Sequence, residues 1–77
     1  MNYELWMERA KVSISELKQN QEFFVKGLFK ETVWDELENK DKREFGKHFK
    51  NEINENKLSF VKWIEDVKGK GAKYIIT

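Results

Sequence analysis

Apolar residues recur at helical intervals at the start of the chain. Between Tyr3 and Lys18 they follow one another every three or four positions, at Tyr3, Trp6, Ala10, Ile14 and Leu17, with Met7 beside them. This period predicts an amphipathic helix. The polar run at 18–21 breaks the pattern. The aromatic and β-branched run from Glu22 to Lys26 then predicts a short strand that Gly27 ends.

Two polar pairs, each spaced by three positions, predict the starts of two more helices. Thr32 with Asp35 fits the reciprocal capping pattern, in which two side chains satisfy free N–H groups at a helix start. It predicts a short helix running to about residue 39. Asp41 with Glu44 fits the same pattern and predicts a helix to about Asn56, a residue that can end a helix in the left-handed conformation.

The predicted helix at 41–56 has two distinct faces. At 100° per residue, Phe45, Phe49 and Ile53 form an apolar stripe that should face the core. Gly46 costs about 1 kcal/mol relative to Ala inside a helix, so we expect another helix or strand to approach the backbone there.

The period changes to two after this helix. The run from Lys57 to Asp66 alternates over β-branched and aromatic residues and predicts a strand. A glycine-rich loop at 67–72 and a closing strand at 73–77 complete a hairpin with a basic tip. The order helix, strand, helix, helix, strand, loop, strand predicts an α+β, winged helix-turn-helix fold with a small antiparallel sheet and the hairpin loop as the wing. It spans 1–77 as a single domain.

Composition narrows the possible environments. The chain contains no cysteine, which excludes disulfides, thiolate metal sites and cysteine nucleophiles and fits a reducing compartment. No apolar run approaches the roughly 20 residues that cross a bilayer, and the N-terminus lacks the order of a signal peptide. We expect a cytoplasmic protein.

Charge is unevenly distributed along the chain. The net charge is +1, but residues 1–40 carry −2 and residues 41–77 carry +3. Positively charged and amide side chains on the helix at 41–56 form a stripe roughly opposite the apolar one. Arginine can pair with guanine, asparagine with adenine and lysine with phosphate, so we predict DNA contact there and at the basic wing. The predicted DNA-binding residues are Arg43, Lys47, Lys50, Asn51, Asn54, Lys68, Lys70 and Lys73. The alternative for both sets is a solvated surface.

No residue pattern predicts catalysis, a cofactor or a metal. His48 is the single histidine, and it has no neighbouring ligand or acid at a spacing that would make it a metal ligand or a base. The serines lack the context of a nucleophile. We therefore expect neither an enzyme nor a cofactor.

Several segments resemble a known family. They are Glu22–Phe29, Trp34, Arg43–Phe49 and Lys73–Tyr74. With them the chain resembles a domain of unknown function found in very small proteins of low-GC Gram-positive bacteria, their plasmids and their phages. The resemblance implies a winged-helix-like fold and carries no established activity or site. Members tend to have a Pro-Gly turn before the first strand, where this chain has Gln19-Asn20, so the type of that turn stays open.

Two functions from different classes fit these observations. The first is a small DNA-binding transcription regulator from a mobile element, which binds double-stranded DNA through the third helix and the wing. The second is a protein–protein interaction module on the same scaffold, such as a phage or plasmid protein that binds a host protein. Tyr3, Trp6, Met7 and Trp63 also leave open a homodimer formed through the first helix. That helix has a polar face of mixed sign, so we do not expect it to bind a membrane.

Overall fold

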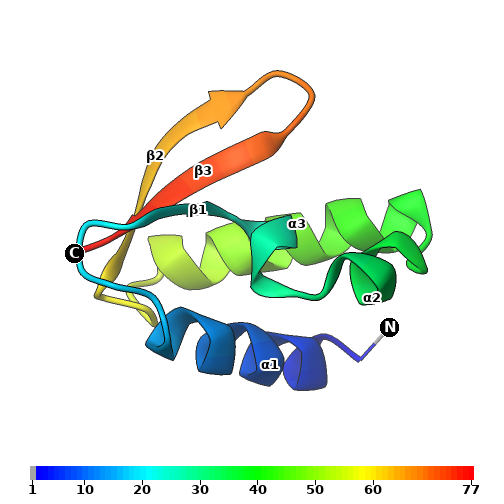
Figure 1. The fold of residues 1–77 in the computed structure, drawn as a ribbon, viewed down its shortest axis with the longest axis horizontal. Coiled ribbons are helices and arrows are strands. Elements are labelled where there is room, and N and C mark those ends of the chain that lie inside the picture. The colour runs from blue at the N-terminus through cyan, green and yellow to red at the C-terminus, as the bar shows by residue number, and fades with distance from the viewer. Residues whose placement is uncertain (1) are drawn as a thin grey trace.

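Within residues 2–77, which the computed structural model describes, the chain forms three α-helices and a three-stranded antiparallel sheet (Figure 1). The elements follow one another as α1 (Tyr3–Ser15), β1 (Glu22–Phe24), the 3₁₀ turn η1 (Val25–Leu28), α2 (Glu31–Asp35), α3 (Asn39–Asn54), β2 (Val61–Val67) and β3 (Gly71–Ile76). The predicted α+β class is therefore confirmed. None of the helices in this part of the chain has the length and apolar character needed to cross a membrane.

The sheet has β3 at its centre, in the order β1-β3-β2. Tyr74 on β3 lies opposite Phe23 of β1 on one side and opposite Trp63 of β2 on the other. A β-bulge lies in β2 between Trp63 and Glu65. In the view of Figure 1, α1 lies along one side of α3 and the β2–β3 hairpin extends on the other.

The first helix begins where the pattern predicts and ends earlier than expected. Asn2 caps it, because its side-chain oxygen accepts a hydrogen bond from the Leu5 N–H at 3.1 Å. The helix stops at Ser15 instead of Lys18. The reason is a tighter final turn, in which the Leu17 N–H donates to the Ile14 carbonyl.

The first strand is shorter than predicted, and the segment after it is a 3₁₀ turn. β1 ends at Phe24 instead of Lys26, and Gly27 lies inside η1 instead of ending a strand. This turn buries Leu28 to 5 % exposure, and the Ser13 hydroxyl of α1 donates to the Leu28 carbonyl at 2.6 Å. Packing onto α1 therefore overrides the local preference for a strand.

The predicted caps of α2 and α3 are wrong. Lys30 and Glu38 occupy the two N-cap positions, and neither side chain caps its helix. Thr32 lies inside α2, and Asp41 lies in the first turn of α3, where a carboxylate still favours the helix dipole. Glu44 does not cap α3, because its carboxylate accepts a hydrogen bond from the hydroxyl of Tyr3 on α1.

α3 ends at Asn54, slightly before the predicted Asn56, and the left-handed conformation predicted for Asn56 is confirmed. Asn56 has φ 61°, in the left-handed region. The Asn56 N–H donates to the Ile53 carbonyl and the Lys57 N–H to the Glu52 carbonyl, both at 3.0 Å, which is the Schellman arrangement. The chain then turns before β2, so this strand begins at Val61 instead of Lys57, and β3 begins at Gly71. Leu58 is buried within the turn.

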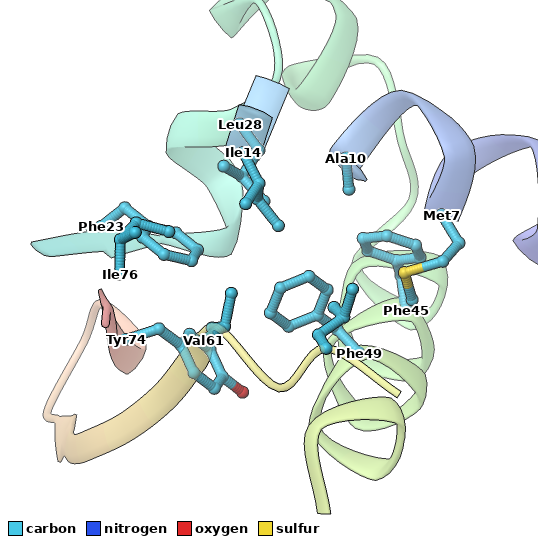
Figure 2. Close-up of a cluster of buried hydrophobic side chains, with 11 residues drawn as sticks. Met7, Ala10, Ile14, Phe23, Leu28, Phe45, Phe49, Val61, Tyr74 and Ile76 are labelled. Carbon is cyan, nitrogen blue, oxygen red and sulfur yellow. The ribbon is translucent and has the colours of Figure 1, made fainter. Parts of the chain in front are cut away.

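The core gathers side chains from α1, α3 and all three strands (Figure 2). Phe45 and Phe49 are completely buried, which confirms the predicted apolar stripe of α3. The Phe49 and Tyr74 rings make a T-shaped contact at a centroid distance of 5.1 Å, and Tyr74 stacks on Phe23 at 5.8 Å. These contacts connect α3 to β3 and β1.

Gly46 has no neighbour that explains it. A Cβ built at this position would meet no atom within 4 Å, so the expected close approach of another element is wrong. The same holds for Gly69 and Gly71 in the hairpin, but those two glycines have φ +80° and +90°. They are required by the backbone of the turn, whereas Gly46 is not.

We therefore expect Gly46→Ala to stabilise the protein. Alanine gains up to about 1 kcal/mol over glycine inside a helix, and the open space accepts its methyl group. Thermal unfolding should shift upward by several degrees, at roughly 4–8 °C per kcal/mol for a domain of this size. Gly71→Ala adds the same methyl group at positive φ and should lower the midpoint. Equal shifts for the two variants would contradict this account.

We also expect Tyr74 to make stability fall at alkaline pH. Burial, with the nearby Asp66 carboxylate, raises the pKa of Tyr74 from 10.0 to about 12. Above pH 10 the Tyr74 hydroxyl therefore loses its proton in the unfolded chain but keeps it in the folded chain. The contribution of this hydroxyl to stability is complete below pH 10 and is lost between pH 10 and 12. Urea unfolding of wild type and Tyr74→Phe at pH 8 and pH 11 should show a larger loss in wild type. The hydrogen bond to Glu44 also raises the pKa of Tyr3 to about 12. Wild type and Tyr74→Phe both contain Tyr3, so its titration does not affect the difference between them. An equal loss in both would show that the Tyr74 hydroxyl titrates normally.

Candidate nucleic-acid interface

The side of α3 that faces away from the core carries positive and amide side chains. Burial of Phe45 and Phe49 sets the rotation of the helix, and positions about 180° away are directed outward. They are the predicted DNA-binding residues of the helix, Arg43, Lys47, Lys50, Asn51 and Asn54. Of these, Lys50 is half-buried and the others are exposed.

The acidic residues of α3 lie on other sides of the helix. Glu44 faces α1 through its hydrogen bond with Tyr3, which lowers the pKa of the Glu44 carboxyl. Glu52 lies 3.6 Å from the His48 Nε2 atom and 3.8 Å from the Lys57 Nζ atom. These contacts direct Glu44 and Glu52 away from the row of positive and amide side chains.

A groove of about 570 Å³ separates α3 from the β2–β3 hairpin. Its apolar lining includes Trp34 of α2 and Tyr74 of β3, together with Val25 and Ala72. Gly46 lies in the α3 wall, and Gly69 and Gly71 lie in the hairpin wall. The groove is also lined by six cationic side chains, Lys26, Lys42, Arg43, Lys47, Lys50 and Lys70.

These cations have no acidic partner within the described part of the chain. Between residues 2 and 77, no carboxylate oxygen lies within 4.0 Å of their charged nitrogens. Asp66 is the acidic residue of the groove lining, and its Oδ1 atom accepts a hydrogen bond from the Trp63 Nε1–H at 3.1 Å. The Lys50 Nζ atom lies 5.4 Å from the Trp63 ring centroid, a cation–π contact. The groove is therefore a region of positive potential.

The structure separates the three lysines predicted for the wing. Lys70 lines the groove, and Lys68 is exposed in the hairpin turn outside the groove lining. Lys73 alternates with Tyr74 along β3 and so points to the other face of the sheet. Its Nζ atom lies 3.4 Å from the Glu22 carboxylate and 5.8 Å from the Phe24 ring centroid.

Of the predicted residues, the groove thus brings together Arg43, Lys47, Lys50 and Lys70. Asn51 and Asn54 stand beside them on α3, and Lys73 lies apart.

Sequence reasoning missed two cations and two rings of this groove. Lys42 could have been found, because it precedes Gly46 by four residues and Lys50 follows Gly46 by four, which places all three in one row of the helix. Lys26 gave no signal, because it reaches the groove from η1, a turn that the pattern did not predict. Trp34 and Tyr74 stand out in the sequence only within the segments that carry the family resemblance, and no spacing marked them as groove residues.

The expectation that His48 has no acid at a suitable spacing is wrong, because Glu52 follows it by four residues on α3 and the Glu52 carboxylate lies 3.6 Å from the His48 Nε2 atom. The His48 ring stacks on Tyr3 at a centroid distance of 5.4 Å, beside the Glu52 carboxylate. Within residues 2–77, no group of three or more His, Cys, Asp or Glu side chains is arranged to hold a metal ion.

Most of the aromatic surface of α1 packs within the chain. Met7 is buried, Trp6 contacts Phe29 at a centroid distance of 5.0 Å, and Tyr3 reaches Glu44. Leu5 and Val12 are the large apolar residues of α1 that remain exposed in the described structure. A dimer through α1 would therefore rest on aliphatic contacts and not on the aromatic residues from which it was inferred.

Comparison with known proteins places the chain in a family without adding a function. Neither the curated proteins nor the solved structures contain a match. Residues 8–74 match one family, described as "Domain of unknown function (DUF1413)". This match covers most of the chain, including η1, α3 and the hairpin that form the groove, and the chain therefore belongs to the DUF1413 family.

Proposed function

We propose that this protein is a winged-helix DNA-binding domain that acts as a small regulator. The observation that carries the proposal is the continuity of positive charge between α3 and the hairpin. Arg43, Lys47 and Lys50 of the helix line the same groove as Lys70 of the hairpin, and none of the four has a carboxylate partner in the described structure. The sheet order β1-β3-β2 beside three helices also supports a winged-helix assignment.

In this proposal, α3 lies in the major groove of the duplex. Arg43 can donate two hydrogen bonds to a guanine, and Asn51 or Asn54 can pair with an adenine edge. Lys47 and Lys50 neutralise phosphates, which supplies affinity without sequence information. In the same arrangement, Lys70 of the hairpin lies beside the phosphate backbone of the duplex. An origin on a plasmid or phage of a low-GC Gram-positive bacterium belongs to the same proposal and rests on the family resemblance.

A protein partner is the second candidate, and one observation favours it. Phe60, in the turn before β2, and Trp63, on β2, are each 45 % exposed. β2 is an edge strand, so both side chains lie at the margin of the sheet. Exposed aromatic residues are enriched at the centres of protein interfaces. Phe60 does not line the groove, so a DNA-binding domain should keep its DNA affinity in Phe60→Ala, whereas an interaction module should lose affinity for its partner.

Charge reversal on α3 tests the first proposal. Lys47→Glu with Lys50→Glu should weaken binding to a mixed-sequence duplex by at least tenfold. The slope of log Kobs against log salt should become shallower by roughly 2, because two phosphates are no longer neutralised. The measurement is a fluorescence anisotropy titration at about 50 and 200 mM salt.

The matched control for this charge reversal is Lys11→Glu with Lys18→Glu. These two lysines are exposed on α1 and just beyond it, and their substitution changes the net charge by the same amount. An equal loss of DNA affinity in both double variants would show that the effect depends on net charge alone and not on the position of the lysines. Unchanged binding and salt slope in the α3 variant would contradict the proposal.

The two hairpin lysines Lys70 and Lys73 should contribute differently to DNA affinity. Lys70→Gln should weaken duplex binding severalfold, because Lys70 shares the groove with the α3 cations. Lys73→Gln should leave the affinity within about twofold, because Lys73 is paired with Glu22 on the opposite face of the sheet. The same titration measures both variants. A larger effect at Lys73 than at Lys70 would place the DNA on the other side of the sheet.

A further inference from the structure

Gly46 reduces the stability of α3 without any packing reason inside the chain. Glycine in the middle of a helix is unfavourable, and here neither a positive φ nor a close neighbour requires it. What glycine does provide is exposed helix backbone at the wall of the groove. A glycine at such a position allows a bound molecule to approach the backbone closely.

The wall opposite Gly46 also lacks side chains at two positions, although there the positive φ of the turn requires glycine. Gly69 and Gly71 of the hairpin line the groove, and a Cβ at either would meet only open space. Trp34, which is half-buried, supplies aromatic surface to the groove, whereas Tyr74 is only 1 % exposed and contributes little. The volume of about 570 Å³ falls in the range of roughly 300–1,000 Å³ that is usual for small-ligand sites.

The charge around this space suits a small polyanion. Six cations line the groove against one carboxylate, and that carboxylate is already hydrogen-bonded to Trp63. A single carboxylate ligand would leave most of these cations unused, whereas a chain of phosphates can contact several at once. The apolar lining calls for a flat organic group beside the phosphates, since aromatic side chains stack readily on nucleobases.

We propose that the groove between α3 and the hairpin is a binding site for a free nucleotide that carries more than one phosphate, of the nucleoside triphosphate class. Lys42, Arg43 and Lys47 hold the phosphates against the backbone at Gly46. Trp34 and the neighbouring apolar residues receive the base. Bound nucleotide neutralises cations that the proposed DNA surface also uses, so it would oppose DNA binding; this consequence alone rests on the proposed function.

Isothermal titration calorimetry of the purified protein with ATP and with GTP, at 150 mM salt and without DNA, tests the site. At least one of the two should bind with a dissociation constant below about 100 µM. Tripolyphosphate and adenosine should each bind at least tenfold more weakly, because each lacks one half of the recognised chemistry. Failure of both nucleotides to bind at 1 mM, or equal binding of tripolyphosphate, would overturn the proposal. Because no DNA is present, its failure is distinguishable from a failure of DNA binding.

Gly46→Leu tests the place of binding without a change in charge. The leucine side chain would project into the groove, so nucleotide affinity should fall at least tenfold. Thr32→Leu adds a similar side chain at an exposed position of α2 outside the groove lining and should change affinity less than twofold. Equal affinities in the two variants would place the nucleotide elsewhere and overturn the assignment. Thermal unfolding of both variants verifies that each is folded.

A charge variant provides an independent test. Lys26→Gln with Lys42→Gln removes two groove cations that are not among the predicted DNA contacts. It should weaken nucleotide binding at least tenfold. Lys11→Gln with Lys18→Gln makes the same change in net charge away from the groove and should have less than a twofold effect. Equal losses of nucleotide affinity in the two double variants would show that binding is a nonspecific attraction to positive charge, which would overturn the proposed site.

Discussion

The burial of Phe45 and Phe49 is the constraint on which the rest of the structure depends. Both rings are fully excluded from water, and each contributes on the order of 1.5–3 kcal/mol by burial. Because the two residues are four positions apart, they occupy one side of α3 and leave a single rotation of the helix that hides them both. That rotation directs Arg43 and Lys47 outward. The orientation of the candidate interface is therefore a consequence of the core.

Tyr74 connects this core to the groove. Its ring packs against Phe49 of α3 and Phe23 of β1, and the residue also lines the space beneath the hairpin. The contact between Phe49 and Tyr74 thus determines where β3 stands relative to α3, and the position of β3 determines where the hairpin stands. This contact contributes to the separation of the two groove walls, and the missing side chain at Gly46 leaves open space at the α3 wall.

A protein with net charge +1 can still present a surface of one sign, because its acidic residues are used elsewhere. Glu44 is held by Tyr3 on the α1 side, Glu52 lies beside His48 and Lys57, and Glu22 pairs with Lys73 across the sheet. The same pairing removes Lys73 from the candidate site. Counting charges along the chain could not show this separation, because it depends on which faces the elements turn toward each other.

Features with a local cause could be predicted from the sequence. The start of α1, the buried stripe of α3 and the left-handed residue Asn56 that follows the end of α3 could be predicted from residue spacing and from the tolerance of asparagine for positive φ. The α+β class follows from the change of period along the chain. These features need no knowledge of distant segments, because neighbouring residues alone determine them.

Tertiary structure decided the features that depend on contacts between distant segments. Glu44 binds the hydroxyl of Tyr3 and so does not cap α3. Leu28 packs beside α1, and the chain after β1 therefore forms the turn η1. The groove itself joins side chains from η1, α2, α3 and the hairpin, so Lys26 and Lys70 become neighbours of one space only in the folded chain. The sequence by itself determined the elements and their buried faces. Packing between elements, which no local pattern encodes, decided which exposed charges share a site.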